Sequence, residues 1–335
     1  KNIKRMAEKA EKSGVVFRPH FKTHQSAEVG EFFKDAGVKS ITVSSVDMAE
    51  YFADNGWNDI TVAFPVNIRE IGKINELAAK IDLNLLVESV RTVNYLKTNL
   101  KSKTRVWIKI DIGYNRTGLD FSDTSKILDV VRGINECDNL ILEGLLTHTG
   151  HSYHAKSEDE IRNLFAETVE RLNNVKERLA GEGFKDIKIS VGDTPGCSVV
   201  ETFENVDEIR PGNFVFYDVT QVFLRSCSFK NIGVAVACPV VAKHTERNEI
   251  VIYGGAVHLS KEFIEDHTGN RIFGLVALES DPKWKPLMRT YVSSLSQEHG
   301  IIKTDEQTFN KIHIGDLVLV LPVHSCLTVD LLLNK

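Results

Sequence analysis

The chain has 335 residues, of which 42% are hydrophobic and 26% are charged, and its formal net charge is −5 at pH 7. This composition is typical of a globular protein, and the slight acidic excess argues against the basic surface that nucleic-acid-binding proteins usually carry. The longest apolar run, Gly233–Ala242, is far shorter than the roughly 18 residues that a membrane span needs. We therefore expect a globular protein that binds neither nucleic acid nor a membrane.

The number and spacing of the cysteines indicate the redox state of the cellular compartment. The chain has five, scattered and without a C-x-x-C pair, which predicts neither a disulfide framework nor a four-cysteine zinc site. Such usage is typical of a reducing environment, so we expect a cytoplasmic protein. Since the sequence opens at Lys1 without an initiator methionine, a signal peptide can be neither assigned nor excluded.

The first two-thirds of the chain alternate short apolar, β-branched runs with longer polar stretches of helical period. Near-continuous apolar runs such as Val106–Ile110 are typical of strands covered on both faces. Eight such runs separated by helices predict a (β/α)8 barrel of the TIM type rather than an open doubly wound sheet. The expected strands are Val15–Phe21, Ser40–Ser44, Ile60–Pro65, Leu83–Val87, Arg105–Asp111, Leu140–Thr147, Asp186–Val191 and Phe214–Tyr217. The expected helices are Val46–Asn55, Ile68–Lys80, Val90–Leu100, Ser122–Glu136 and Ser157–Gly181.

The last third of the chain has a different sequence pattern, in which apolar runs are separated by short turns and not by long helical stretches. It predicts a mainly antiparallel β domain. The expected strands are Gly233–Lys243, Glu249–Val257, Arg271–Leu278, Gly300–Lys303 and Asp316–Leu321. We therefore expect an α/β protein with two domains, a barrel over residues 1–231 and a β domain over residues 232–335.

Barrel enzymes carry their active sites at the carboxyl ends of the strands. The first expected strand ends in Arg18–His24, where Lys22 is a candidate nucleophile. Partial burial beside other cations favours a neutral amine, which could form a Schiff base with a carbonyl compound or pyridoxal phosphate. An ordinary surface lysine in a loop is the alternative.

Two further strand ends carry polar clusters. A glycine-rich loop after the fifth expected strand could aim Arg116 at a phenolate or a carboxylate, although a structural turn explains this loop equally well. The sixth strand is followed by Thr147–His154, with three histidines that include His148 and His151. They could ligate a metal, stack on a flat cofactor, or act as acid and base, and a polar loop with incidental histidines is the alternative.

Small residues and glycines follow the seventh expected strand at Ser190–Gly196 and precede the eighth at Arg210–Asn213. They could hold a phosphate through backbone N–H groups, or form a helix cap and a strand-entry turn. In the β domain, His324 and Cys326 would face the same side if the chain stays extended. Imidazole and thiolate suit Zn²⁺, and two protein ligands would leave positions open for water and substrate. Taken alone, however, an H-x-C pattern is common and usually has no function.

Taken together, these motifs resemble the pyridoxal-phosphate enzymes of the alanine-racemase fold (fold type III), and within them the D-threonine aldolase/D-serine dehydratase branch. The resemblance runs from R-P-H-F-K-T-H at residues 18–24 to H-S-C at residues 324–326 and so covers nearly the whole chain. These two motifs are its most specific parts. It implies a homodimer and a small-molecule D-amino-acid substrate.

The resemblance also implies roles for matching positions. Lys22 would be the Schiff-base lysine, Arg116 would lie near the phenolic oxygen of pyridoxal 5′-phosphate, and His148 would lie against its ring. The residues assigned to the cofactor are Lys22, Arg116, His148, Tyr153, Gly192, Asp193, Thr194, Arg210, Gly212, Asn213 and Tyr217. The residues assigned to catalysis are Lys22, His148 and His151, and those assigned to Zn²⁺, or to another divalent metal such as Mn²⁺, are His324 and Cys326.

The implied activity is that of a lyase on D-β-hydroxy-amino acids, most specifically a D-serine dehydratase that releases pyruvate and ammonia. Lys22 would take the Cα proton, while the metal would polarise the β-hydroxyl as a Lewis acid. A retro-aldol cleavage of D-threonine or 3-hydroxy-D-aspartate, with His151 or His148 as the base, is the alternative. A further alternative is a protein that binds pyridoxal phosphate without catalysing a reaction. Racemisation is disfavoured because Gly274–Glu279 lacks the Met-Asp element near which racemases of this fold place a second base.

Overall fold

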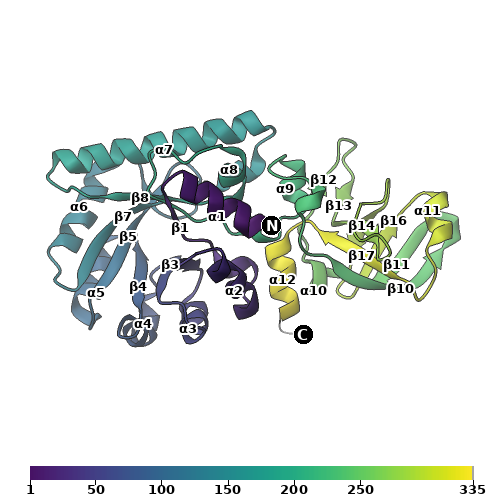
Figure 1. Cartoon of the computed structure of the whole chain (residues 1–335), viewed down its shortest axis with the longest axis horizontal. Helices are drawn as coiled ribbons and strands as arrows, with labels where there is room; N and C mark the ends of the chain where they lie inside the picture. The colour runs from purple at the N-terminus through teal and green to yellow at the C-terminus, as the bar shows by residue number, and fades with distance from the viewer. Residues whose placement is uncertain (334–335) are drawn as a thin grey trace. The chain divides into compact units, whose positions relative to one another are not determined.

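The computed structural model describes residues 1–333, and the chain divides into two compact units, Lys1–Gly212 and Asn213–Lys335 (Figure 1). Within the described part, no helix is long and apolar enough to cross a bilayer. None of the five cysteines, all of which lie in that part, forms a disulfide. The domain boundary expected at residue 231 stays a prediction.

Eight parallel strands form the sheet of the first unit, in the order β1-β9-β8-β7-β5-β4-β3-β2. Between the outer strands β1 and β2, a parallel bridge joins His20 to Thr42, and the backbone N–H of Thr42 donates to the carbonyl of Pro19. With helices around this sheet, the predicted (β/α)8 barrel is confirmed in nearly closed form (Figure 1). The strands are β1 Val16–Phe17, β2 Ser40–Val43, β3 Asp59–Pro65, β4 Asp82–Val87, β5 Thr104–Asp111, β7 Leu140–Leu146, β8 Lys188–Val191 and β9 Glu208–Ile209, with a short β6, Leu119–Asp120, paired to β5.

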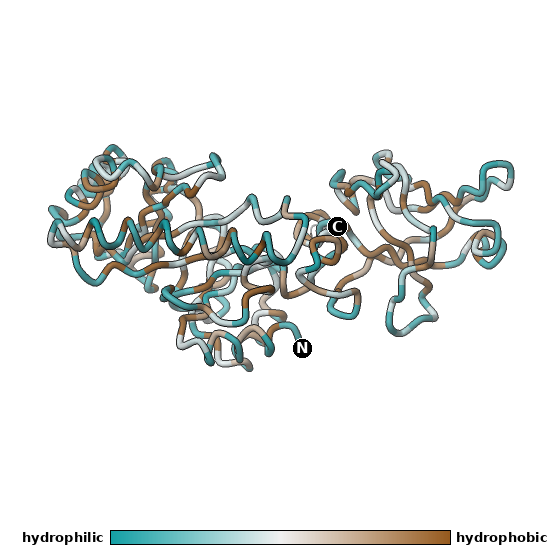
Figure 2. Tube along the Cα trace, turned by 90° about the horizontal axis from the view of Figure 1, so that it is seen from above, coloured by the Kyte–Doolittle hydropathy of each residue, from teal (hydrophilic) through white to brown (hydrophobic). Residues whose placement is uncertain are grey.

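Serine side chains begin many of the barrel helices. Ser26, Ser45, Ser89 and Ser157 each accept a hydrogen bond from a backbone N–H of the first turn, which stabilises the helix start. The long helix α7 alternates hydrophilic and hydrophobic positions and buries one stripe (Figure 2). The helices are α1 Asn2–Lys12, α2 Ala27–Asp35, α3 Val46–Asp54, α4 Ile71–Ala78, α5 Val90–Asn99, α6 Thr124–Asn135, α7 Glu158–Gly181 and α8 Thr194–Val199, with 3₁₀ helices η1 Phe21–Thr23, η2 Ile68–Glu70 and η3 Gly150–His154.

The barrel encloses a network of buried charges. The Arg18 guanidinium donates to Glu208 at 2.5 Å and to the two carboxylate oxygens of Asp59 at 2.6 and 3.0 Å. The hydroxyl of Ser190 donates to Glu208 at 2.6 Å and accepts from Nε of Arg210 at 2.6 Å. The charges are therefore paired and hydrogen-bonded, which is the condition under which buried charge is tolerated.

The prediction of the eighth strand at Phe214–Tyr217 is wrong. That segment begins as a 3₁₀ turn and ends at Tyr217, whose φ of 49° lies in the left-handed region. The eighth strand is Glu208–Ile209, which pairs with β8 and β1. Its polar sequence resembles a loop, but Glu208 points to a buried partner, Arg18, rather than to solvent.

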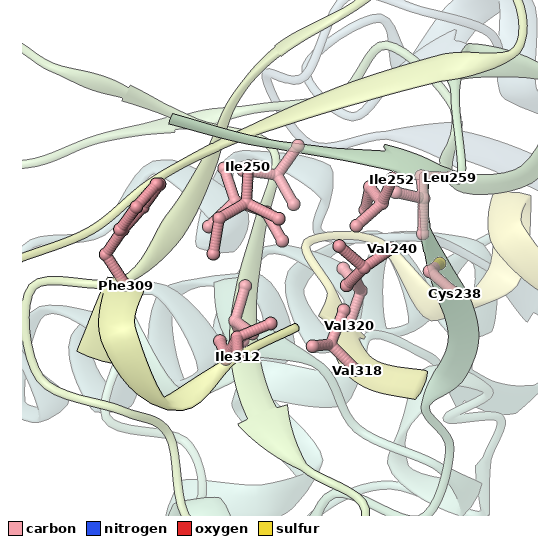
Figure 3. Close-up of a cluster of buried hydrophobic side chains, with 12 residues drawn as sticks. Cys238, Val240, Ile250, Ile252, Leu259, Phe309, Ile312, Val318 and Val320 are labelled. Atoms are coloured by element: carbon pink, nitrogen blue, oxygen red, sulfur yellow. The ribbon is translucent and has the colours of Figure 1, made fainter. Parts of the chain in front are cut away.

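In the second unit, six antiparallel strands close into a barrel in the order β10-β11-β16-β15-β14-β17, which confirms the predicted antiparallel β domain. Aliphatic side chains fill it, and Phe309 and Ile312 pack against them (Figure 3). The strands are β10 Val236–His244, β11 Glu249–Tyr253, β14 Gly274–Leu278, β15 Tyr291–Leu295, β16 His299–Lys303 and β17 Leu317–Pro322, with a separate pair β12 Ile264–Glu265 and β13 Arg271–Ile272. The helices are α9 Val219–Phe223, α10 Ala256–Leu259, α11 Glu306–Lys311 and α12 Ser325–Leu333, with 3₁₀ helices η4 Asn213–Val215, η5 Phe229–Asn231 and η6 Thr245–Arg247.

Candidate active site

Lys22 follows the first barrel strand and lies in the short helix η1. The side chain of His20 caps this helix by accepting a long hydrogen bond, 3.4 Å, from the backbone N–H of Lys22. Phe21 and Thr23, on either side, are fully buried, whereas Lys22 is exposed. Buried neighbours thus hold the backbone while the lysine side chain stays accessible to a reactant.

The second histidine of this motif, His24, is a packing residue. Its ring stacks on Phe33 and meets Phe21 and Phe52 edge to face, and its Nδ1 accepts from the backbone N–H of Ser26 at 3.1 Å. Burial lowers the pKa of His24 to about 3. His24 is therefore neutral at physiological pH and anchors the segment that carries the lysine.

His148 follows β7, and its Nδ1 lies 2.5 Å from the carbonyl oxygen of Gly192. Burial, and then the positive charge of Lys22, hold the pKa of His148 well below its usual range. A neutral imidazole beside a carbonyl donates its N–H to it, so Nδ1 carries the proton and Nε2 the lone pair. The ring is thus fixed in one tautomer and one orientation.

Four basic side chains share this region of the barrel, and we call Lys22, Lys109, Arg116 and Arg210 the basic cluster. Burial, followed by Lys22 and Arg210, holds the pKa of His20 well below its usual range. Burial, followed by Arg210 and Arg116, lowers the pKa of Lys109 to about 7. A chain with a net charge of −5 therefore concentrates positive charge at one place, which suits an anionic ligand. Lys109 was not among the predicted site residues, although a lysine inside an apolar strand was a signal for it.

Tyr114 is a second residue that the sequence did not single out. Its ring centroid lies 6.1 Å from that of His148 and 6.4 Å from that of His151, and the Arg116 guanidinium lies over it at 5.1 Å. A Cβ on Gly150 would be only 2.3 Å from the Tyr114 ring. The tyrosine therefore joins the loops that follow β5 and β7, and both loops carry predicted site residues.

Asp193 holds two loops together. Its Oδ1 accepts from the backbone N–H of Gly196 at 2.6 Å and from the hydroxyl of Ser152 at 2.9 Å. Burial raises the pKa of Asp193 to about 6. Beside it, the backbone N–H of Thr194 donates to the Tyr153 hydroxyl at 3.4 Å. The predicted phosphate loop is thus connected to the loop of His148 through side chains.

The glycines assigned to phosphate binding lie where backbones approach closely. A Cβ on Gly192 would be 2.9 Å from the Cβ of Arg210, and one on Gly212 would be 3.1 Å from the Cβ of His20. The Arg210 guanidinium donates to Ser190 Oγ at 2.6 Å and to two backbone carbonyls. Burial lowers the pKa of Arg210 to about 10, which leaves it charged at neutral pH.

The second unit brings His324 and Cys326 together by a route that the sequence did not indicate. The chain does not stay extended: β17 ends at Pro322 and α12 begins at Ser325, whose backbone N–H donates to the Asp218 carboxylate at 3.0 Å. The imidazole and the thiol nevertheless share a hydrogen bond. The helix start thus places the two side chains side by side.

Two residues assigned to the cofactor, Asn213 and Tyr217, belong to this second unit. Tyr217 is fully buried. The amide nitrogen of Asn213 donates to Asp218 at 2.5 Å and lies 3.8 Å from the sulfur of Cys326. Asn213 therefore lies beside the histidine–cysteine pair.

The residues present fit the two groups that the resemblance implies. The basic cluster suits a phosphate and a phenolate, the accessible Lys22 suits a carbonyl, and the neutral ring of His148 suits an aromatic face. Imidazole and thiolate together suit a borderline divalent metal. Over residues 1–333, no group of three or more His, Cys, Asp or Glu side chains could hold a metal ion.

The family model for the alanine racemase N-terminal domain matches residues 1–219, and that for the "Putative serine dehydratase domain" matches residues 233–333. A curated relative, the D-serine dehydratase of Dictyostelium discoideum, is 29% identical over 353 residues, which cover 98% of this chain and 87% of that protein. Among solved structures, D-threo-3-hydroxyaspartate dehydratase from Delftia sp. HT23 has a TM-score of 0.90 at 25% identity and covers 98% of this chain and 89% of that one. Its cysteine-to-alanine mutant has been solved in a metal-free form. D-threonine aldolase from Filomicrobium marinum shares the fold, with a TM-score of 0.82 at 20% identity and coverage of 98% and 86%.

These matches confirm the predicted resemblance over nearly the whole chain. The first family model covers well over half of the 335 residues, and the second begins at residue 233 and covers most of the remainder. The chain belongs to the alanine racemase N-terminal domain family and carries a serine dehydratase-type domain after the barrel.

Proposed function

We propose that the chain is a pyridoxal-phosphate-dependent lyase that removes water from a D-β-hydroxy-amino acid, with D-serine as substrate and pyruvate and ammonia as products. The observation that carries this proposal is the basic cluster, in which an accessible lysine shares its surroundings with Arg116 and Arg210 beside the neutral ring of His148. The full-length similarity to a D-serine dehydratase supports the same conclusion.

The barrel would hold the cofactor through Lys22 as a Schiff base, through Arg116 at the phenolic oxygen and through the loops of Gly192 and Gly212 at the phosphate. When bound, pyridoxal phosphate supplies an electron sink for the charge left at Cα. Lys22 would also accept the Cα proton at its Nζ. His148 keeps its orientation through Gly192 and presents a neutral face, so it adds no positive charge beside the lysine.

His324 and Cys326 would hold a divalent metal, Zn²⁺ or an ion such as Mn²⁺. Such a metal supplies a Lewis acid that makes the β-hydroxyl a better leaving group. The pair lies in the segment that matches the serine dehydratase domain, which supports this assignment.

The test is a product assay on cofactor- and metal-loaded protein with D-serine and D-threonine, in which keto acid and glycine are followed separately. We expect pyruvate from D-serine and 2-oxobutyrate from D-threonine, lost with EDTA and restored with Zn²⁺. Release of glycine and acetaldehyde would instead identify the protein as an aldolase. Bound cofactor without turnover of either substrate would favour a non-catalytic binding protein.

One observation favours the aldolase as a second candidate. The Nδ1 of His151 is buried and has no hydrogen-bond partner, and burial lowers the pKa of His151 below its usual value. A neutral imidazole with an uncommitted nitrogen can take the proton of a β-hydroxyl, which is the step that a retro-aldol cleavage needs. The variant His151→Gln would then abolish glycine release, whereas pyruvate release from D-serine would persist.

We further propose that the protein is a cytoplasmic homodimer. The absence of disulfides among its five cysteines supports a reducing compartment. The dimer is an expectation from the alanine-racemase fold. Sedimentation of active enzyme as a monomer would contradict it.

A further inference from the structure

A buried carboxylate joins the starts of two helices in the second unit. Asp218 is 1% exposed and caps α9 by accepting from the backbone N–H of Gln221 at 3.0 Å. The same carboxylate accepts from the backbone N–H of Ser325 at 3.0 Å. Asp218 therefore fixes where α12 begins, and Cys326 lies in the first turn of that helix.

A buried amide completes this arrangement. The side-chain nitrogen of Asn213 donates to Asp218 at 2.5 Å and to the hydroxyl of Ser325 at 3.0 Å, and it lies 3.8 Å from the sulfur of Cys326. Its Oδ1 is buried without a hydrogen-bond partner. Because Asp218 and Ser325 hold this amide in place, its N–H fixes the direction in which the sulfur of Cys326 lies.

We propose that Asp218 and Asn213 are positioning residues for the metal pair His324 and Cys326, holding both side chains in ligand geometry before the ion arrives. The inference rests on the proposed function, in which this pair binds a divalent metal. Groups that orient metal ligands typically change metal affinity by 10- to 100-fold when they are removed. A residue that only capped a helix would leave metal affinity unchanged.

The second unit offers a matched control. Asp305 caps the short helix α11 by accepting from the backbone N–H of Thr308 at 2.8 Å. The variant Asp305→Asn therefore reports the loss of a cap carboxylate away from the metal pair. It is compared with Asp218→Asn and Asn213→Ala.

The experiment measures Zn²⁺ affinity of the full chain by competition with a chromogenic chelator, together with the sulfur-to-metal charge-transfer band of bound Co²⁺. We expect Asp218→Asn and Asn213→Ala to bind Zn²⁺ about 10- to 100-fold more weakly than wild type and to shift the Co²⁺ band. Asp305→Asn should match wild type in both. Cofactor absorbance should not change in Asp218→Asn or in Asp305→Asn.

The outcomes separate the two proposals. If wild type binds no metal, the metal role in the proposed function fails, and the inference fails with it. If wild type binds Zn²⁺ and Cys326→Ala does not, while Asp218→Asn and Asn213→Ala bind like wild type, the inference alone is overturned. Should Asp218→Asn fail to fold, Asn213→Ala decides, because it leaves both backbone hydrogen bonds of Asp218 in place.

Discussion

His148 shows how a single residue is restricted by its surroundings. Its Nδ1 is committed to the carbonyl of Gly192, and protonation of the ring would place a second positive charge beside Lys22. Any proton that His148 exchanges must therefore pass through Nε2. This agrees with the proposal, in which His148 is a neutral support for the cofactor ring and Lys22 takes the Cα proton.

Lys22 carries the first residue-level prediction. Lys22→Ala removes the only amine that the proposal assigns to the cofactor, so the absorbance of bound pyridoxal phosphate should disappear and lyase activity should fall by at least about 10²–10⁴-fold, the range of an acid–base contribution alone. Spectra of dialysed protein and product assays check both effects.

The matched control is Lys22→Arg, which keeps the positive charge of the basic cluster but cannot form a Schiff base at physiological pH. It should fold like wild type and remain inactive. A cofactor-like spectrum that survived in either variant would remove Lys22 as the anchor.

Gly150 carries the second prediction, because the Tyr114 ring occupies the space that a side chain would need. Gly150→Ala should displace the ring and cost about 1–3 kcal/mol of unfolding free energy, as overpacking does, together with most of the activity. Adding Tyr114→Ala should recover the stability that Gly150→Ala loses, as measured by urea unfolding. A double variant no more stable than Gly150→Ala alone would show that the contact is not the cause.

At the scale of elements, periodicity was enough to predict most of the barrel. The predicted strands from Ser40–Ser44 to Asp186–Val191 are confirmed to within two residues at each end. The exceptions are strands whose extent depends on tertiary pairing. The first strand, β1, covers only Val16–Phe17. The strand Glu208–Ile209 was missed because the Glu208 carboxylate is paired inside the barrel with Arg18, which lies 190 residues away in sequence. No local pattern contains that information.

The residues of the candidate site also divide into those that belong to local motifs and those that depend on contacts between distant parts of the chain. The position of Lys22 near His148 was predictable because each belongs to a contiguous motif at a strand end. Asp218 was not, since its role depends on a contact with Ser325, 107 residues later in the chain. The roles of individual site residues stay predictions until variants are measured.

The barrel network gives an element-level prediction about stability. Glu208→Gln removes one of the two carboxylates that pair with Arg18, whose side chain is 8% exposed, and should cost about 1.5–3 kcal/mol, the range of a hydrogen bond to a charged group, because Asp59 still pairs with the guanidinium. Glu31→Gln, which breaks the exposed pair with Lys34, should cost less than about 1 kcal/mol. Urea unfolding of both variants checks the contrast, and equal costs would show that the network is not needed for stability.

At the scale of the whole molecule, the barrel keeps several histidines neutral while the chain as a whole is acidic. The pKa of each of His20, His24 and His148 is lowered, chiefly by burial. Unfolding returns them to water, where they bind protons below their ordinary pKa of about 6.5. The unfolded chain then holds more protons than the folded one, so stability must fall as the pH drops below that value.

His24 allows this to be measured, because burial lowers its pKa to about 3 and it lies outside the basic cluster. The contribution of neutral His24 to the free energy of unfolding is complete above pH 6.5 and is lost as the pH falls toward 3. Between pH 7 and pH 5, this loss amounts to about 2 kcal/mol. Burial raises the pKa of Asp193 to about 6, so its titration changes stability with pH in the opposite direction. The comparison is therefore made between wild type and a His24 variant, both of which retain Asp193. The variant His24→Phe, which fills the same aromatic site without a proton, should lose about 2 kcal/mol less than wild type over this range in urea unfolding. Equal losses would mean that His24 does not remain neutral in the folded barrel.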